Sequence, residues 1–325
     1  MKYLMVKLKP RSFLHLGERE GWYEGSKSYI SSDTIFSALC HCHLLLYGEV
    51  DSFIKAFTSD EPPFLLSSAF PYWEENLYFP LPKNQFIRDK DLKKIKFVNL
   101  KLLERLLAGK KIEELKEEIQ RITELDFLPR FEKSNSLQPI NPYTVENIPR
   151  VALSRLSNHP GENFFYFGQV KYREKAGLFI LIDMKNKEWE SSVKALFRLF
   201  ADEGIGGDRT CGKGLFHSPE FASLEIPENS DSNAFYALST YFPKPQEISG
   251  LENCFYDLEL RKGYIYSPAN KSYRRRSIRV FSEGSVFTGQ KRIGSLVDIT
   301  PEIFKTHRIY RYGLLFSIPC KMEAK

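Results

Sequence analysis

The segment from Gly204 to Phe216 combines five glycines with two cations, Arg209 and Lys213. Glycine has no Cβ, so its backbone N–H can turn toward a ligand and a positive φ is tolerated. A bend of this kind can bind an anion through its amides, and nearby cations strengthen that binding. The alternative is a tight turn that simply requires glycine, the commonest turn residue. The segment therefore predicts either an anion-binding loop or a structural turn.

The spacing of the glycines excludes two familiar nucleotide-binding loops. A Walker-type loop needs Ser or Thr after its lysine, and Lys213 is followed by Gly214. A dinucleotide fingerprint needs a strand before the glycines and a helix after them. Here residues 191–201 have helical periodicity, and Leu215 and Phe216 begin a strand-like run. A loop that joins a helix to a strand favours a nucleic-acid backbone over a nucleotide pocket.

A second cationic segment runs from Arg261 to Arg292 and contains a single acid, Glu283. Aromatic residues are interleaved with its cations. Cations neutralise phosphates and rings stack on bases, and these are the two parts of a single-strand binding surface. A solvated charged face is the alternative. The cations of the segment are Arg261, Lys262, Lys271, Arg274, Arg275, Arg276, Arg279, Lys291 and Arg292.

Two groups of residues could support other chemistry. The run from Cys40 to His43 has metal-binding residue types, but adjacent residues on a helix point around its axis and not at one centre. We therefore expect no metal and no cofactor. His15 could act as a general base, with Arg11 and Lys27 stabilising a phosphorane, yet no paired histidine or carboxylate cluster accompanies it. A structural role for His15 is favoured.

The composition limits the number of domains, the class of partner and the cellular setting that the chain can have. A chain of 325 residues predicts two domains, and a net charge of +6 permits a nucleic-acid partner without requiring one. Five cysteines without framework spacing indicate a reducing, cytoplasmic setting. Neither a signal peptide nor an apolar run long enough for a membrane is visible in the sequence.

The order of expected elements predicts an α+β fold. A strand at residues 2–9 precedes a helix that starts after Ser31 to Asp33, an N-cap signature. An insertion at about 81–160 holds a helical region, Leu100 to Leu125, and an irregular stretch, Phe127 to Pro160. Residues 164–172 and 177–184 read as a hairpin of two strands, followed by the helix, the glycine loop and a strand. Without the insertion, this is the ferredoxin-like (RRM-like) βαββαβ order.

The second half is strand-rich and predicts another ferredoxin-like domain. The expected domains are therefore residues 1–220, with the insertion and the glycine loop at 204–214, and residues 221–325.

Four segments together resemble the RAMP superfamily of CRISPR proteins. More narrowly they resemble the Csm subunit four family, the Cas-five-like group of type III-A effector complexes. The segments are Ser31 to Leu39, Gly204 to Phe216, Val280 to Phe287 and Arg311 to Ser317. The glycine segment alone indicates only the superfamily, whereas the four in this order are more specific. The insertion matches no motif of the family.

The resemblance implies two ferredoxin-like domains and no catalytic role, because a different, repeated subunit of such complexes cuts target RNA. It implies a subunit that holds the 5′ repeat-derived handle of the crRNA and contacts the large polymerase-like Csm subunit one. The backbone RAMP, Csm subunit three, is the other expected partner. The insertion is expected to be the thumb that bends the guide. Two alternatives stay open: a metal-independent endoribonuclease of repeat RNA, and a scaffold that touches protein only.

The expected RNA-binding residues come from the residue patterns of the sequence and from the family resemblance. Ser32 and Asp33 are expected to cap the first helix and aim its N-terminus at RNA. Arg150 and Arg155 are the candidate phosphate contacts of the insertion. The family's loop maps to Gly206, Gly207, Arg209, Gly212, Lys213 and Gly214. The amides of Gly206 and Gly207, with Arg209 and Lys213, are expected to hold consecutive phosphates of the handle. The RNA strand is expected to cross the junction between the two domains on six cations: Arg274, Arg275, Arg276, Arg279, Lys291 and Arg292.

Overall fold

The computed structural model describes residues 1–19, 22–90, 92–121, 142–154, 156–157, 164–228, 230–267 and 273–322. Its largest sheet has seven strands in the order β11-β1-β10-β5-β6-β7, with β4 also paired to β10. Every neighbouring pair in it is antiparallel. The strands are β1 (Lys2–Leu8), β4 (Phe64–Leu66), β5 (Phe70–Trp73), β6 (Asn76–Pro80), β7 (Phe97–Asn99), β10 (Ala176–Met184) and β11 (Glu220–Glu225).

Two helices connect the central strands of this sheet. Helix α1 (Ser32–Tyr47) leads from β1 toward β4, and α5 (Glu190–Glu203) leads from β10 to β11. Each buries one apolar stripe, which includes Phe36 on α1 and Phe197 on α5. Strand order β11-β1-β10-β5 with these crossovers is the predicted ferredoxin-like arrangement. The predicted α+β class is confirmed.

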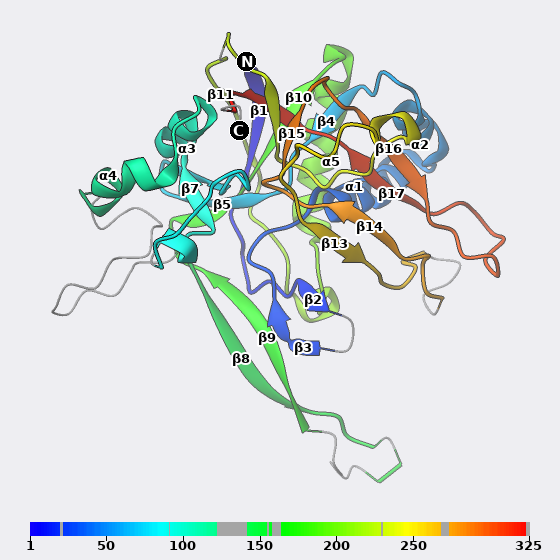
Figure 1. The fold of residues 1–325 in the computed structure, drawn as a ribbon. Coiled ribbons are helices and arrows are strands. Elements are labelled where there is room, and N and C mark those ends of the chain that lie inside the picture. The colour runs from blue at the N-terminus through cyan, green and yellow to red at the C-terminus, as the bar shows by residue number, and fades with distance from the viewer. Residues whose placement is uncertain are drawn as a thin grey trace, which may run out of the picture.

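The predicted hairpin of residues 164–172 and 177–184 is wrong in its pairing. Strand β10 already has β1 on one side and β4 and β5 on the other, so no edge is left for β9 (Phe164–Tyr172). Instead, β9 pairs with β8 (Tyr143–Val151) over nine residue pairs. Figure 1 shows this ribbon projecting from the body, beside β2 (Gly17–Arg19) and β3 (Trp22–Ser26). Strand β8 lies in a stretch that we predicted to be irregular.

The remaining described helices are short, and the one at Leu100–Leu107 packs against β6 and β7 at one edge of the large sheet. The predicted helical region of the insertion is present as two short helices joined by a 3₁₀ turn, Ile112–Leu115. Its last four residues, 122–125, lie outside the described residues. The helices are α2 (Asp51–Thr58), α3 (Leu100–Leu107) and α4 (Lys116–Arg121). In the described part of the chain, no helix is long and apolar enough to cross a membrane.

The C-terminal half is built from short strands. A three-stranded sheet has the order β15-β12-β18, and β13-β14 and β16-β17 form two-stranded ribbons. Within the described ranges, all α-helices precede Gly204, and the C-terminal half holds one 3₁₀ turn, Pro245–Glu247. The strands are β12 (Ala234–Ala237), β13 (Leu258–Arg261), β14 (Ile278–Phe281), β15 (Val286–Thr288), β16 (Gly294–Asp298), β17 (Tyr310–Leu314) and β18 (Ser317–Cys320).

The two halves share one hydrophobic core. Strand β11 pairs with β1 from Glu220 onward, so the N-terminal unit extends past the boundary predicted between residues 220 and 221. Tyr312 of β17 packs on Phe36 of α1 with ring centroids 5.0 Å apart, and its hydroxyl accepts a hydrogen bond from the Leu66 amide at 2.9 Å. The junction between the halves is therefore built of packed side chains. Both termini lie at the same end of the large sheet (Figure 1).

Candidate nucleic-acid interface

A groove of about 1320 Å³ separates the segment after β3 from strand β13. We call it the main groove. Its lining holds seven basic side chains and one acid, Glu259, together with the rings of Tyr29, Phe97, Tyr143 and Tyr264. This charge balance suits a polyanion, and an exposed ring such as that of Tyr264 suits a base. The basic residues are Lys27, Lys96, Arg261, Lys262, Arg274, Arg275 and Arg311.

A smaller hollow of about 290 Å³ adjoins the main groove. We call it the side hollow; α1, the glycine loop and Tyr266 line it. Thr34, Arg275 and Arg311 line both spaces, so these side chains stand where the two meet. The Arg209 guanidinium lies 4.8 Å from the centroid of the Tyr266 ring, a cation–π contact at the mouth of this hollow.

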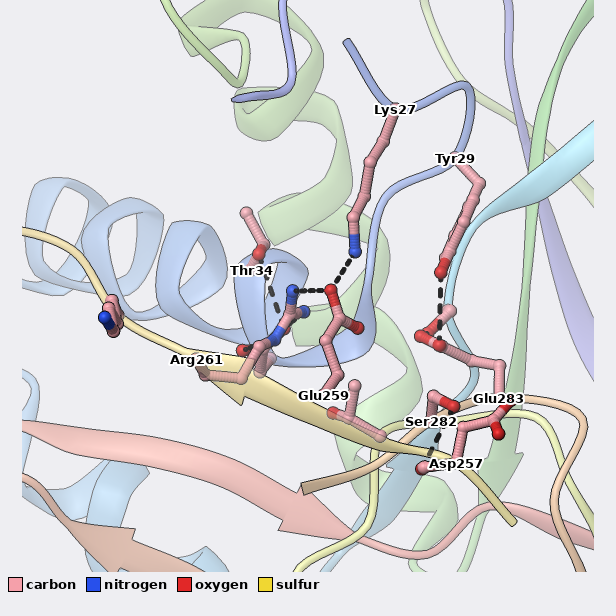
Figure 2. Close-up of polar contacts among 12 residues, drawn as sticks. Lys27, Tyr29, Thr34, Asp257, Glu259, Arg261, Ser282 and Glu283 are labelled. Atoms are coloured by element: carbon pink, nitrogen blue, oxygen red, sulfur yellow. Dashed lines mark hydrogen bonds and ion pairs between the residues drawn. The ribbon is translucent and has the colours of Figure 1, made fainter. Parts of the chain in front are cut away.

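A buried ionic cluster forms the floor where the two spaces meet. The Asp33 carboxylate accepts hydrogen bonds from Arg261, with 3.1 Å from Nε to Oδ2, and from Arg311. Burial opposes ionisation of Asp33, but the two guanidinium groups outweigh it and hold its pKa well below the usual value. Figure 2 shows Glu259 between Lys27 and Arg261, with ion pairs to both. The cluster ties α1 to β13 and β17.

The position of Asp33 corrects one prediction. Asp33 is 3% exposed and bound to arginines, and the Ser32 hydroxyl is buried against Thr240 Oγ1 at 2.9 Å. The N-cap is Ser31, whose side chain makes no capping hydrogen bond. Ser32 and Asp33 are therefore internal and do not offer the helix N-terminus to RNA.

Most backbone amides of the glycine loop donate hydrogen bonds to carbonyl oxygens within the protein. The Gly207 amide donates to the His15 carbonyl at 2.9 Å, and the Gly214 amide donates to the Phe13 carbonyl at 2.9 Å. The Gly212 amide closes the short 3₁₀ turn on the Arg209 carbonyl. These three amides are not available to a phosphate, so the prediction that the amide of Gly207 holds one is wrong. Of the loop residues predicted to bind RNA, Gly206 and Arg209 line the side hollow.

Lys213 belongs to a different cluster, centred on Asp208. The Asp208 carboxylate lies 2.5 Å from Arg150 Nη2 and 3.4 Å from Lys213 Nζ. Partial burial would raise the pKa of Asp208, but the hydrogen bonds and charges of these two cations hold it below its usual value. Both cations also lie over the Phe167 ring. The cluster anchors the β8–β9 ribbon to the glycine loop.

His15 lies beneath this cluster and is 7% exposed. Its Nδ1 is 2.6 Å from the Gly168 carbonyl oxygen, and its ring packs on Phe167 with centroids 4.0 Å apart. Burial is the main cause that lowers the pKa of His15. The imidazole is thus a packed, neutral group that lines neither the main groove nor the side hollow.

The structure separates the predicted cations of the C-terminal half. Arg274 is exposed over the Tyr264 ring and, with Arg275, lines the main groove. Arg292 is buried, and its guanidinium donates to the carbonyls of Glu247 and Gly250, so its role is structural. Three other predicted cations are exposed and line neither space: Arg276, Arg279 and Lys291. Arg155 lies outside the described residues.

Five basic groove residues are absent from the predicted RNA-binding set: Lys27, Lys96, Arg261, Lys262 and Arg311. Arg261 and Lys262 stand inside the cationic segment, so their local charge was a usable signal. Lys27 stands alone and Lys96 follows Lys93 and Lys94; the two segments are distant in sequence, and only the fold brings them together. Arg311 lies 278 residues from its partner Asp33.

Comparison with known families agrees with this geometry. The family model of the RAMP superfamily matches residues 7–217. The chain belongs to the RAMP superfamily. In this RAMP, residues 230–320 match a second family model, the CRISPR Csm4 C-terminal domain. The two matches span both halves of the chain, and the resemblance to Csm subunit four is confirmed.

Curated relatives of this RAMP carry the same description, "CRISPR system Cms protein Csm4". The protein from Methanocaldococcus jannaschii is 26% identical over 93% of this chain and 89% of its own length. The protein from Thermococcus onnurineus is 26% identical over 88% of this chain and 90% of its own length.

Solved structures support the fold of this RAMP. A chain of the Csm3-Csm4 subcomplex of the type III-A CRISPR-Cas interference complex aligns with a TM-score of 0.66 and 23% identity, over 99% of this chain and 100% of that chain. A chain of the Csm1-Csm4 cassette in complex with pppApA aligns with a TM-score of 0.61 and 19% identity, over the full length of both.

Proposed function

We propose that this RAMP is a guide-RNA-binding subunit of a type III-A CRISPR interference complex. The observation that carries the proposal is the main groove, whose lining holds seven cations and one acid beside aromatic rings, of which Tyr264 is exposed. Such a lining binds a single strand through phosphate neutralisation and base stacking. The 5′ repeat-derived handle of the crRNA is the strand we assign to it. The cytoplasm is the compartment in which such a complex would work.

We assign the large subunit Csm1 and the backbone subunit Csm3 as its protein partners. The support is that Csm4 chains of the same fold were solved in a Csm1-Csm4 cassette and in a Csm3-Csm4 subcomplex. Residues 230–320 match the Csm4 C-terminal domain, so both halves of the chain carry a family match.

We propose that the subunit has no catalytic role. The endoribonuclease alternative relied on His15, whose imidazole is buried, packed on Phe167 and outside both spaces. A general base must come within hydrogen-bond reach of the proton that it removes. Incubation of the purified chain with repeat RNA should leave the RNA intact. Cleavage that His15→Ala abolishes would establish the nuclease instead.

The proposal is tested by RNA binding at varied salt. Fluorescence anisotropy of the full chain with a labelled single-stranded handle RNA gives the slope of log affinity against log salt. Lys262→Gln combined with Arg274→Gln should weaken binding and reduce the magnitude of the slope by roughly 1.4, since each single-strand phosphate contact contributes about 0.7.

A matched double variant controls for net charge. Lys194→Gln combined with Arg198→Gln removes the same charge from α5, where both cations lie over Phe221 and outside both spaces. This control should keep the wild-type slope. Equal losses in the two double variants would show that binding is not localised in the groove, and a wild type without RNA affinity would leave a scaffold that touches protein only.

A further inference from the structure

Three arginines from separate strands and loops converge where the main groove meets the side hollow. Arg261 is on β13, Arg311 is on β17, and Arg275 precedes β14. Arg275 and Arg311 line both spaces, and Arg261 lines the main groove. Asp33 lines the side hollow below them.

The carboxylates at this junction are already shared. Asp33 pairs with Arg261 and Arg311, and Glu259 pairs with Arg261 and Lys27. Four cations, Lys27, Arg261, Arg275 and Arg311, therefore outnumber the two carboxylates of Asp33 and Glu259. Within the described residues, the Arg275 guanidinium has no ion pair, and the buried Nε atoms of Arg275 and Arg311 have no hydrogen-bond partner.

Arg275 is held in place despite this imbalance. Its backbone amide donates to the Gly263 carbonyl at 2.9 Å, and its guanidinium lies so close to Gly263 that a Cβ there would approach Nη2 to 2.9 Å. Burial, and then the charge of Arg311, lower the pKa of Arg275 to about 10. The charge of Asp33 opposes this shift. A half-buried cation with no ion pair of its own is costly, and proteins keep such groups where an anion completes them.

We propose that one phosphodiester of the bound RNA sits on Arg275 at this junction and completes the charge of the arginine cluster. The inference rests on the proposed function and adds the subsite to it. The planar guanidinium presents paired N–H donors that match two phosphate oxygens, which a lysine at the same place does not. The phosphate marks the point where the strand passes from the main groove to the side hollow.

The first arm of the test uses inorganic phosphate. The thermal midpoint of the full chain is compared in phosphate and in chloride at equal ionic strength. At ten times the dissociation constant, phosphate should raise the midpoint of the wild type by about 2 °C. Arg275→Gln should lose this rise. Arg308→Gln removes the same charge at an exposed site that lines neither space, and should keep it.

The second arm uses the RNA itself. Handle RNAs that each carry one neutral methylphosphonate are titrated against the wild type and the variants. One position should cost the wild type about tenfold in affinity, because a hydrogen-bonded charge pair is lost. The same position should cost Arg275→Gln nothing. Arg275→Lys, which keeps the charge without the fork, should lie between them, and it serves if the glutamine variant does not fold.

The outcomes separate this inference from the proposed function. A wild type that binds RNA with the expected salt slope but shows the same scan as Arg275→Gln overturns the phosphate site alone. A wild type without RNA affinity overturns both. A midpoint rise in phosphate without a sensitive RNA position assigns the cluster to a free phosphate and overturns the RNA assignment.

Discussion

The Asp33 carboxylate binds side chains that are distant from it in the sequence. Its partners Arg261 and Arg311 are 228 and 278 residues away. From the local sequence, Ser31 to Asp33 has the pattern of a helix cap, and the helix does begin at Ser32. The side chains, however, serve the junction of the two halves. Local sequence predicted the element correctly, and could not predict the contacts because they depend on long-range pairing.

His15 supports a prediction about pH. Its pKa in the folded chain lies below 6.5, its value in the unfolded chain. Below about pH 6.5 the unfolded chain binds a proton that the folded chain refuses, so the free energy of unfolding decreases as the pH falls. His15→Gln should make the stability flatter between about pH 7.5 and about pH 5.5, as measured by urea unfolding at each pH.

The exposed His217 provides the control for this measurement. His217→Gln removes one imidazole but should leave the pH dependence of the wild type. If His15→Gln follows the wild-type curve throughout this range, His15 is not held neutral by its surroundings, and its role as a packed group is contradicted.

Among the elements, the glycine loop shows why its glycines are required. A Cβ at Gly214 would collide with the Ile205 carbonyl oxygen, whereas a Cβ at Gly212 would have no atom within 4 Å. Both residues have positive φ, 76° and 79°. The loop is therefore a compact helix-to-strand turn that positions Arg209, and its amides are mostly internal. The structural alternative that we stated for its backbone is the one that these contacts support.

The paired glycines give a prediction for the loop. Gly212→Ala should cost about 1–2 kcal/mol, the strain of a left-handed alanine. Gly214→Ala adds a backbone collision to the same strain, so it should lower the urea midpoint clearly more. The two variants are compared by urea unfolding of the full chain. Equal losses would show that the contact of Gly214 with Ile205 does not constrain the loop.

Strand β13 shows where sequence patterns mislead at the level of elements. Its sequence alternates leucine with charged residues, which predicts leucines toward a core. In the structure Leu258 and Leu260 are exposed at 53% and 47% and line the main groove. Glu259 turns inward because Lys27 binds it (Figure 2), and Arg261 turns inward because Asp33 binds it. Periodicity gave the strand, but the inward face depends on charges from the other half of the chain.

At the scale of the whole molecule, the groove exists because two halves meet. Its basic residues come from both sides of the boundary, and the core beneath it is continuous from Phe36 to Tyr312. We could predict β1, α1, β10 and α5 from sequence because each has a local periodicity, whereas the second strand of the βαββαβ order is formed by β4 and β5 and not by residues 164–172. The groove itself could not be predicted, since Lys27, Lys96 and Arg311 become neighbours only after both halves pack.

The shared core predicts that the halves unfold together. All three tryptophans, Trp22, Trp73 and Trp189, lie in the N-terminal half, so tryptophan fluorescence reports that half alone. Tyr312→Phe, a change in the C-terminal half, leaves the buried Leu66 amide without its acceptor and should cost about 1–3 kcal/mol. If the core is one cooperative unit, this variant lowers the fluorescence midpoint and the circular dichroism midpoint equally.

Tyr256→Phe, on a partly exposed tyrosine of the same half, should leave both midpoints in place. A fluorescence midpoint that Tyr312→Phe does not move, beside a separate earlier transition in circular dichroism, would mean that the C-terminal half unfolds by itself, and a groove built between the halves would then open before the large sheet melts.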